Sequence, residues 1–177
     1  MNWRWISIVL VVMLLLGACG KAGPADHDGH DAMNHSSSGD LPEGLQTAAA
    51  PRYPAGSRAI IRADHMPGMD GAEATIVGAY ETIVYIVSYS PQSGGEPVTG
   101  HQWVIHEEIA DAAPESYRPG DQVTLEADHM AGMEGAVATI DAAEATTVYM
   151  VDYEQTTDGE QVRNHKWVTE SELADLE

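Results

Sequence analysis

The chain of 177 residues contains no phenylalanine, one cysteine, and only 8 lysine and arginine residues against 28 aspartate and glutamate residues. With a single cysteine, no disulfide bond can form within the chain. The net charge of −20 at pH 7 makes nucleic acids and anionic lipid surfaces poor partners and cations good ones, although a need for solubility would also account for it. Because phenylalanine is missing, tyrosine, tryptophan, valine and isoleucine must fill any hydrophobic core.

Motifs of the common enzyme classes are also missing. The sequence has no nucleophile elbow, no phosphate-binding glycine loop, and no carboxylate pair whose spacing indicates acid–base catalysis. The single cysteine, Cys19, directly follows an apolar leader and is not among candidate catalytic residues. We therefore predict that the protein is not an enzyme.

The leader has the pattern of a bacterial lipoprotein signal. Arg4 gives it a positive start, and residues 6–16 (ISIVLVVMLLL) form an apolar run too short to span a bilayer. The run ends in Leu-Gly-Ala-Cys, which resembles a lipobox. We predict that residues 1–18 are a lipoprotein signal peptide and that Cys19 carries the lipid. The protein would then be anchored in the cell membrane and face outside the cytoplasm.

Residues 19–50 form the second segment, which comprises the lipid anchor and a polar stretch rich in glycine, serine, proline and aspartate. This composition is typical of a flexible tether. Side chains that can bind metal gather within it, namely His27, His30, Met33 and His35. Because imidazole suits divalent copper, the tether is a weaker candidate for collecting Cu(II), and a polar linker that happens to carry histidine is the alternative.

The remainder is a tandem repeat. Residues 53–111 align with residues 117–175 without a gap, at a spacing of 64, and 28 of 59 positions are identical. The repeat predicts two domains, residues 51–112 and residues 113–177.

Each repeat has the signals of short β-strands. In the first repeat, strands are expected at residues 57–63, 72–77, 82–89 and 101–105, with one helical turn at 107–110. So many short strands in about 59 residues favour an all-β fold of two tandem small SH3-like antiparallel barrels, which follow the signal peptide and the disordered His-rich tether.

One five-residue motif is present in both repeats: His-Met-Pro-Gly-Met at residues 65–69 and His-Met-Ala-Gly-Met at 129–133. These two segments hold four of the eight methionines of the chain. Glycine at the third position of a four-residue turn favours a type II turn, which brings its first and fourth α-carbons within about 7 Å. The motif thus pairs two thioethers beside an imidazole, and thioethers favour Cu(I). The predicted ligands are His65, Met66, Met69, His129, Met130 and Met133; flexible packing beneath a turn is the alternative for the methionines.

A second histidine, two residues before a tryptophan, is also repeated. His101 precedes Trp103, and His165 precedes Trp167. Since residues i and i+2 of a strand share a face, His101 and His165 could complete the metal sites, with one separate site assembled in each repeat. The tryptophans are expected in the core, although an indole could also shield the ion. Asp64 and Asp128 are expected to cap the turn or to orient the adjacent histidine.

The repeated ADHM-x-GM-x-GA-x-ATI pattern and the NHKWV-x-ESEL ending resemble the YdhK-type lipoprotein family of bacteria, which includes CopL-like extracellular copper-binding lipoproteins. The resemblance covers the lipobox, the tether and both repeats. It implies an extracellular copper buffer that contributes to copper resistance, and a copper exporter is a possible partner.

The predicted function is therefore a membrane-anchored, extracytoplasmic copper-binding lipoprotein that sequesters or buffers copper through His and Met sites in each repeat. Copper would be Cu(I) in the repeats and Cu(II) at the tether. The alternative is a metal-independent tandem SH3-like module that binds the cell wall or another envelope component through aromatic strand faces, namely those of Tyr85, Tyr89, Trp103 and their repeat counterparts.

Overall fold

The computed structural model describes residues 36–176. The predicted signal peptide, Cys19, and the candidate tether ligands His27, His30, Met33 and His35 lie outside these residues. The described elements are, in chain order, β1 (Gln46–Thr47), β2 (Arg58–Ile61), β3 (Glu73–Tyr89), β4 (Val98–Ile105), the 3₁₀ turn η1 (His106–Glu108), β5 (Gln122–Thr124), β6 (Val137–Glu154), β7 (Gln161–Thr169), the 3₁₀ turn η2 (Glu170–Glu172) and β8 (Leu173–Ala174).

The predicted all-β character is confirmed, and residues 36–176 contain no α-helix. They also contain no helix of the length and hydropathy needed to cross a membrane. The separate strands expected at residues 72–77 and 82–89 are instead parts of one 17-residue strand, β3, which begins at Glu73. The helical turn predicted at residues 107–110 overlaps the 3₁₀ turn η1 at residues 107 and 108.

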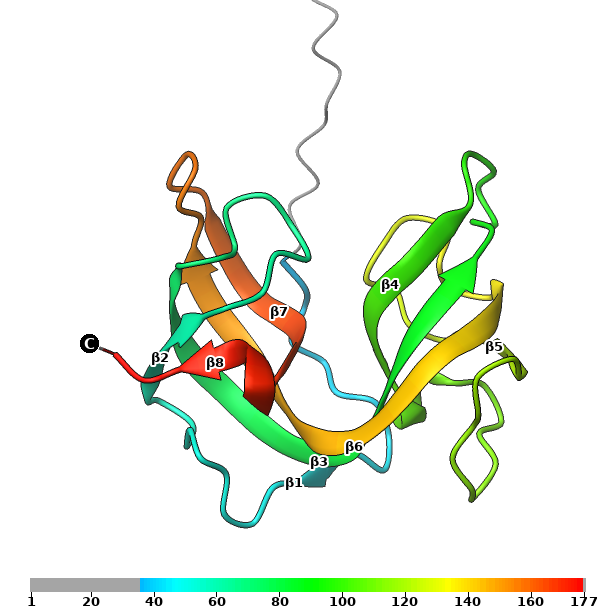
Figure 1. The fold of residues 1–177 in the computed structure, drawn as a ribbon, viewed down its shortest axis with the longest axis horizontal. Helices are drawn as coiled ribbons and strands as arrows, with labels where there is room; N and C mark the ends of the chain where they lie inside the picture. The colour runs from blue at the N-terminus through cyan, green and yellow to red at the C-terminus, as the bar shows by residue number, and fades with distance from the viewer. Residues whose placement is uncertain (1–35, 177) are drawn as a thin grey trace, which may run out of the picture. The chain divides into compact units, whose positions relative to one another are not determined.

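Two long strands organise the sheet. β3 and β6 pair antiparallel from Ala74 opposite Tyr153 to Tyr89 opposite Ala138, and Figure 1 shows the two running side by side from one group of strands to the other. Near the middle, Thr82 lies opposite Thr146, which is its own counterpart at the repeat spacing of 64. The two repeats are therefore related by an approximate twofold axis that passes between Thr82 and Thr146.

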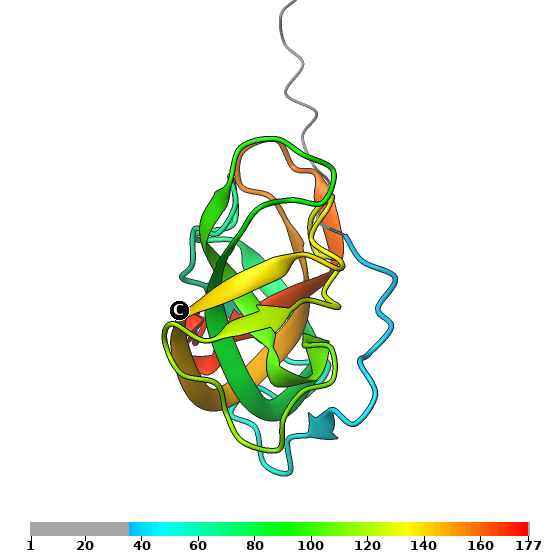
Figure 2. The same ribbon diagram turned by 90° about the vertical axis from the view of Figure 1, so that its right-hand side faces the viewer.

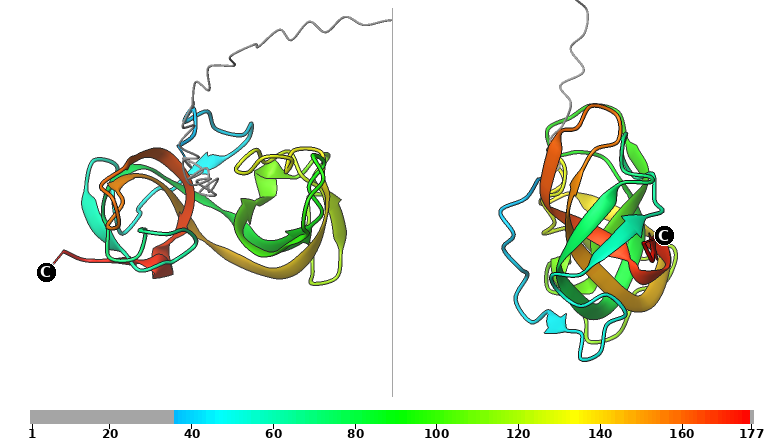
Figure 3. Two further views of the ribbon diagram at one scale, coloured as in Figure 1. Left: turned by 90° about the horizontal axis from the view of Figure 1, so that it is seen from above. Right: turned by 90° about the vertical axis from the view of Figure 1, so that its left-hand side faces the viewer.

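The other strands attach to the two ends of this ribbon and form two lobes. In the first lobe, β2 pairs with the first half of β3 and with β8, and β7 pairs with the second half of β6. In the second lobe, β4 pairs with the second half of β3, and β5 pairs with the first half of β6. Figure 3 (left) shows each lobe curling around its own centre, and Figure 2 shows the second lobe from its outer end.

Each lobe therefore contains one half of each repeat. The buried cluster of the first lobe combines Ala48 and buried residues between positions 53 and 79 of the first repeat with buried residues between positions 149 and 173 of the second repeat. The cluster of the second lobe combines residues 85–109 with residues 123–140. One lobe per repeat was the expectation, with domains at residues 51–112 and 113–177. These ranges remain the repeated units of the sequence, but each lobe is built from halves of both. The halves are exchanged because β3 and β6 stay extended, whereas a self-contained repeat would require each strand to turn back on itself.

A third buried cluster lies where the two lobes meet. Its members all come from the middle of the ribbon or from the strands beside it: Tyr80, Val84, Trp103, Ile105, Val148, Met150 and Trp167. Trp103 is 8% exposed and Trp167 is fully buried, so the prediction that both tryptophans are core residues is confirmed. Since burial of a large apolar side chain contributes about 1.5–3 kcal/mol, this central cluster holds the lobes together.

Part of the segment predicted to be a flexible tether packs on this structure. Within residues 36–50, Ser37 donates a backbone hydrogen bond to Arg163 (3.0 Å), and Gln46 and Thr47 pair with β3. Leu45 contacts the central cluster and Ala48 belongs to the first core. Within the predicted tether of residues 19–50, the described part is therefore folded and not flexible, because the apolar side chains of Leu45 and Ala48 are covered there.

Candidate metal centre

The His-Met-x-Gly-Met motifs form the predicted turns. The Met69 N–H donates to the Met66 carbonyl (3.3 Å), and the Met133 N–H donates to the Met130 carbonyl (3.1 Å). Gly68 and Gly132 both have φ of +77°, as a type II turn requires at its third position. Each turn packs against the hairpin of the other repeat, since Thr156 donates to the Gly68 carbonyl and Gln92 donates to the Gly132 carbonyl.

The two methionines of each turn point to different places. Met69 and Met133 are fully buried and belong to the cores of the first and second lobes. Met66 also belongs to the first core and Met130 packs against the second, but these two methionines additionally line a cavity. A turn fixes the distance between its end α-carbons but not the direction of their side chains, and here the fourth residue faces the core. The geometry therefore favours Met66 and Met130 over Met69 and Met133 as ligands.

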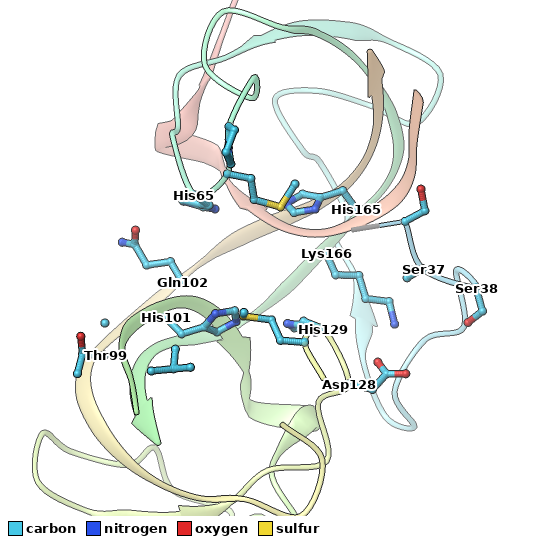
Figure 4. A pocket seen from close by; sticks show the side chains of 16 residues that line it. Ser37, Ser38, His65, Thr99, His101, Gln102, Asp128, His129, His165 and Lys166 are labelled. Carbon is cyan, nitrogen blue, oxygen red and sulfur yellow. The ribbon is translucent and has the colours of Figure 1, made fainter. Parts of the chain in front are cut away.

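A cavity of about 510 Å³ gathers the remaining candidates. It is lined by four histidines and two methionines, together with polar residues that include Asp128 and Lys166. The candidates are His65, Met66, His101, His129, Met130 and His165. Figure 4 shows His65 and His165 on the first lobe, and His101 and His129 on the second. The fifth described histidine, His106, lies elsewhere, within hydrogen-bond distance of Tyr85 and Ala113.

The histidines are grouped by lobe and not by repeat. His101 of the first repeat and His129 of the second have ring centroids 6.0 Å apart. His65 and His165 belong to the first lobe, one from each repeat. The expected grouping, in which each repeat assembles its own ligands, differs from this arrangement because the repeats exchange their halves.

His101 and Trp103 do not share one face of a regular strand, as their spacing predicted. The pairing of β4 with β3 shifts by one residue between His101 and Val104. His101 lines the cavity, whereas Trp103 lies in the central cluster and contacts the ring of His65 edge-on at 6.3 Å. His165 and Trp167 repeat this division on β7.

The carboxylates that contact the motif histidines are glutamates of the 3₁₀ turns, and not the expected Asp64 and Asp128. Nε2 of His65 lies 2.6 Å from Glu172 Oε1, and Nε2 of His129 lies 2.8 Å from Glu108 Oε1. Each glutamate is the third residue of its turn and accepts the backbone N–H of the capping residue, Ile105 or Thr169. One signal in the sequence could have found them: acidic residues recur unchanged at only four positions of the aligned repeats, and Glu108 with Glu172 is one of them.

Both glutamates have lowered pKa values. Burial raises the pKa of Glu108, but the charge of His129 and hydrogen bonds from His129, Ile105 and Trp167 outweigh burial. Burial also raises the pKa of Glu172, and hydrogen bonds from His65 and Thr169, together with the charge of His65, outweigh it. Each carboxyl group is thus held in its ionised form beside a histidine of the cavity.

Tyrosines pack behind the other two histidines. The Tyr89 ring contacts His101 edge-on at 6.2 Å, and the Tyr153 ring contacts His165 edge-on at 5.8 Å. Burial raises the pKa of Tyr153 to about 12, so its hydroxyl stays protonated at neutral pH. The tyrosines limit the space into which the two imidazoles can turn.

The comparisons with known proteins agree with the repeat and the fold. The family described as "Protein of unknown function (DUF1541)" matches residues 55–106 and 119–170, one segment in each repeat. The protein described as "Uncharacterized protein YdhK" of Bacillus subtilis (strain 168) is 53% identical over 176 residues, which cover 94% of this chain and 86% of YdhK.

Solved structures of that relative are also similar. The 2.00 Å crystal structure of a DUF1541 family protein (ydhK) from B. subtilis has a TM-score of 0.80 at 60% identity, covering 83% of this chain and all of that one. The solution NMR structure of the YdhK C-terminal domain has a TM-score of 0.66 at 62% identity, covering 68% of this chain and 92% of that one. The chain therefore belongs to the DUF1541 family, as a relative of B. subtilis YdhK.

Proposed function

We propose that this protein binds copper in the cavity between its lobes and so sequesters or buffers copper outside the cytoplasm, where a lipid on Cys19 anchors it to the cell membrane. The single observation that carries the proposal is the cavity lining, in which four imidazoles and two thioethers surround one space. In fold terms, we propose that each lobe is a small SH3-like antiparallel barrel, assembled from one half of each repeat.

The residues present fit a soft metal ion. The Nδ1 atoms of His65 and His129 are buried and have no hydrogen-bond partner within residues 36–176. Over the same residues, no group of three or more His, Cys, Asp or Glu side chains is placed to hold a metal. The donor set that we propose therefore depends on sulfur: His65, Met66 and His165 from the first lobe, and His101, His129 and Met130 from the second. Neutral imidazole and thioether donors of this kind suit Cu(I).

The alternative module that binds the cell wall through aromatic residues has less support. Tyr85 is fully buried, Tyr89 is 4% exposed and Trp103 is 8% exposed. These side chains fill the cores, and so they offer little surface to a polymer or a partner.

The test is an anaerobic Cu(I) titration of the 20–177 fragment against a competing chelator. Met66→Leu should weaken one site by on the order of tenfold, which corresponds to ~1.4 kcal/mol, because it removes a thioether that faces the cavity. Met69→Leu is the matched control, since it changes the buried methionine of the same turn. It should leave Cu(I) affinity unchanged and cost less than about 1.5 kcal/mol of stability. Failure of the wild-type fragment to retain Cu(I) against the chelator would reject the proposal.

A further inference from the structure

Glu108 and Glu172 each hold a histidine of the cavity and a tryptophan of the opposite lobe. Glu172 Oε1 lies 2.6 Å from His65 Nε2, while its Oε2 accepts the indole N–H of Trp103 at 2.9 Å. Glu108 Oε1 lies 2.8 Å from His129 Nε2, while its Oε2 accepts the indole N–H of Trp167 at 3.0 Å. The side chains of Glu108 and Glu172 are 5% and 15% exposed, so their surroundings are almost entirely protein.

The other groups at these carboxylates are donors. Oε2 of Glu172 accepts the Thr169 N–H at 2.8 Å and the Thr169 hydroxyl at 2.9 Å, in addition to the indole. Oε2 of Glu108 accepts the Ile105 N–H at 3.2 Å. Indole and backbone N–H groups cannot accept hydrogen bonds. Each carboxylate therefore accepts in all of its hydrogen bonds. The Nε2 atom of the adjacent histidine must then be the donor, and so it carries the ring proton.

The position of that proton decides which nitrogen can bind a metal. A neutral imidazole with its proton on Nε2 has its lone pair on Nδ1. In His65 and His129, Nδ1 is buried and has no hydrogen-bond partner in the described part of the chain. Both histidines line the cavity next to the methionine that follows them in sequence.

We propose that Glu108 and Glu172 are positioning residues that hold His129 and His65 in the Nε2–H tautomer and so present Nδ1 to a soft metal ion. The identity of the ion rests on the proposed function, whereas the tautomer is a property of the metal-free protein. Histidine ligands of metals commonly donate their second ring N–H to a carboxylate, and loss of such a partner costs about 10- to 100-fold in affinity. Because the indole on each carboxylate comes from the other lobe, the docking of the lobes keeps both ligands oriented.

The experiment is ¹⁵N–¹H NMR of the imidazoles in the metal-free protein, at a pH where they are neutral, followed by addition of Cu(I). His65 and His129 should both show the Nε2–H tautomer.

The Glu172→Gln variant tests the role of the carboxylate. The indole N–H of Trp103 and the N–H and hydroxyl of Thr169 still require an acceptor at the former Oε2 position, so the amide oxygen should occupy it. The amide NH₂ then faces His65 Nε2 and donates to it, so the proton of the neutral His65 ring should lie on Nδ1. His129, held by the unchanged Glu108, is the internal control, and Glu108→Gln should give the mirror result. Each variant should lose about 10- to 100-fold in Cu(I) affinity at one site.

Several outcomes separate this proposal from the copper function. An Nδ1–H tautomer in the metal-free wild type would overturn it even if copper binds, and this measurement decides the matter if a variant does not fold. Loss of the Nε2–H signals upon Cu(I) binding would also overturn it, because the metal would then occupy Nε2. The expected tautomers without any Cu(I) binding would support the positioning role and reject copper as the ligand.

Discussion

Trp103 on β4 donates its indole N–H to both carboxylate oxygens of Glu172, at distances of 2.9 and 3.2 Å, although the two residues belong to different lobes and lie 69 positions apart. Trp167 and Glu108 form the equivalent bond in the opposite direction. The lobes are therefore joined by two crossed polar contacts as well as by the central cluster and the β3–β6 ribbon.

The first prediction concerns this contact. Trp103→Phe keeps an aromatic ring in the central cluster but removes the indole donor. Since a hydrogen bond to a charged group contributes about 1.5–3 kcal/mol, the free energy of unfolding should fall by at least that amount in urea denaturation. Trp167→Phe should lose more, because Trp167 is fully buried whereas Trp103 is 8% exposed. A loss below about 0.5 kcal/mol for Trp103→Phe would show that the indole N–H does not stabilise the fold.

The second prediction concerns acid. The pKa values of Glu108 and Glu172 are lowered in the folded protein from an ordinary value of 4.5. A carboxyl group with a lowered pKa contributes stability that is present above its unfolded value and is lost as pH falls through its folded value. Thermal stability should therefore decline as pH falls below about 4.5, and the decline should be shallower in Glu108→Gln. Parallel curves of Tm against pH for the wild type and the variant would show that the lowered pKa of Glu108 does not cause the loss of stability in acid.

The third prediction concerns the methionine turns. A Cβ at Gly132 would lie 2.9 Å from the Ser93 backbone nitrogen, and Gly132 also has φ of +77°. Gly135 is the matched control, with φ of +75° but no atom within 4 Å of an added Cβ. Gly135→Ala should cost roughly 1–2 kcal/mol from backbone strain alone, and Gly132→Ala should cost clearly more. Equal losses in thermal unfolding would mean that the hairpin moves away freely.

The fourth prediction concerns how the histidines combine. Because lobes and not repeats group the ligands, His65→Ala and His165→Ala should weaken the same Cu(I) site, while His101→Ala and His129→Ala should weaken the other. The double variant His65→Ala/His165→Ala should therefore retain one tight Cu(I) site. If His65→Ala/His101→Ala retained one site instead, each repeat would bind its own ion. Competition titration measures both stoichiometries.

The fifth prediction concerns the tether, whose histidines lie outside the described residues. Deletion of residues 26–35 should lower Cu(II) capacity, because three imidazoles are removed, and should leave tight Cu(I) binding intact. Loss of all tight Cu(I) binding after this deletion would place the site in the tether. The measurement is titration of the wild type and of the deletion variant, each with Cu(I) and with Cu(II).

The sequence was informative wherever structure depends on nearby residues. The glycine at the third position of each methionine turn predicted its conformation, and dense β-branched and aromatic residues predicted strand 82–89. The exchange of halves was not predictable in this way. Residues 78–81 and 142–145 carry no strong turn signal, and the local sequence does not decide whether the strand turns back within its own repeat or stays extended and pairs with the copy. That choice depends on packing between distant residues such as Tyr80 and Trp167, whose rings lie 5.7 Å apart.

The same reason explains which candidate residues could be predicted to lie at the cavity. His65, His101, His129 and His165 are repeated, and the structure brings all four to the cavity. Met69 and Met133 are also repeated, but they are core residues, because a core preserves its side chains as strictly as a binding site does. Glu108 and Glu172 were missed, since their contacts cross from one repeat to the other and only the pairing of β3 with β6 brings them to the histidines.

The exchange of halves between repeats has a consequence for how such a protein could arise. A chain with one repeat would hold one half of each lobe, and it could complete both only by pairing with a second copy of itself about a twofold axis. Folding would then depend on protein concentration, because two molecules must meet. Joining the copies through residues 112–116 makes that encounter intramolecular. Gene duplication would thus turn an obligate dimer into a single chain, after which the two halves of the cavity are free to diverge separately.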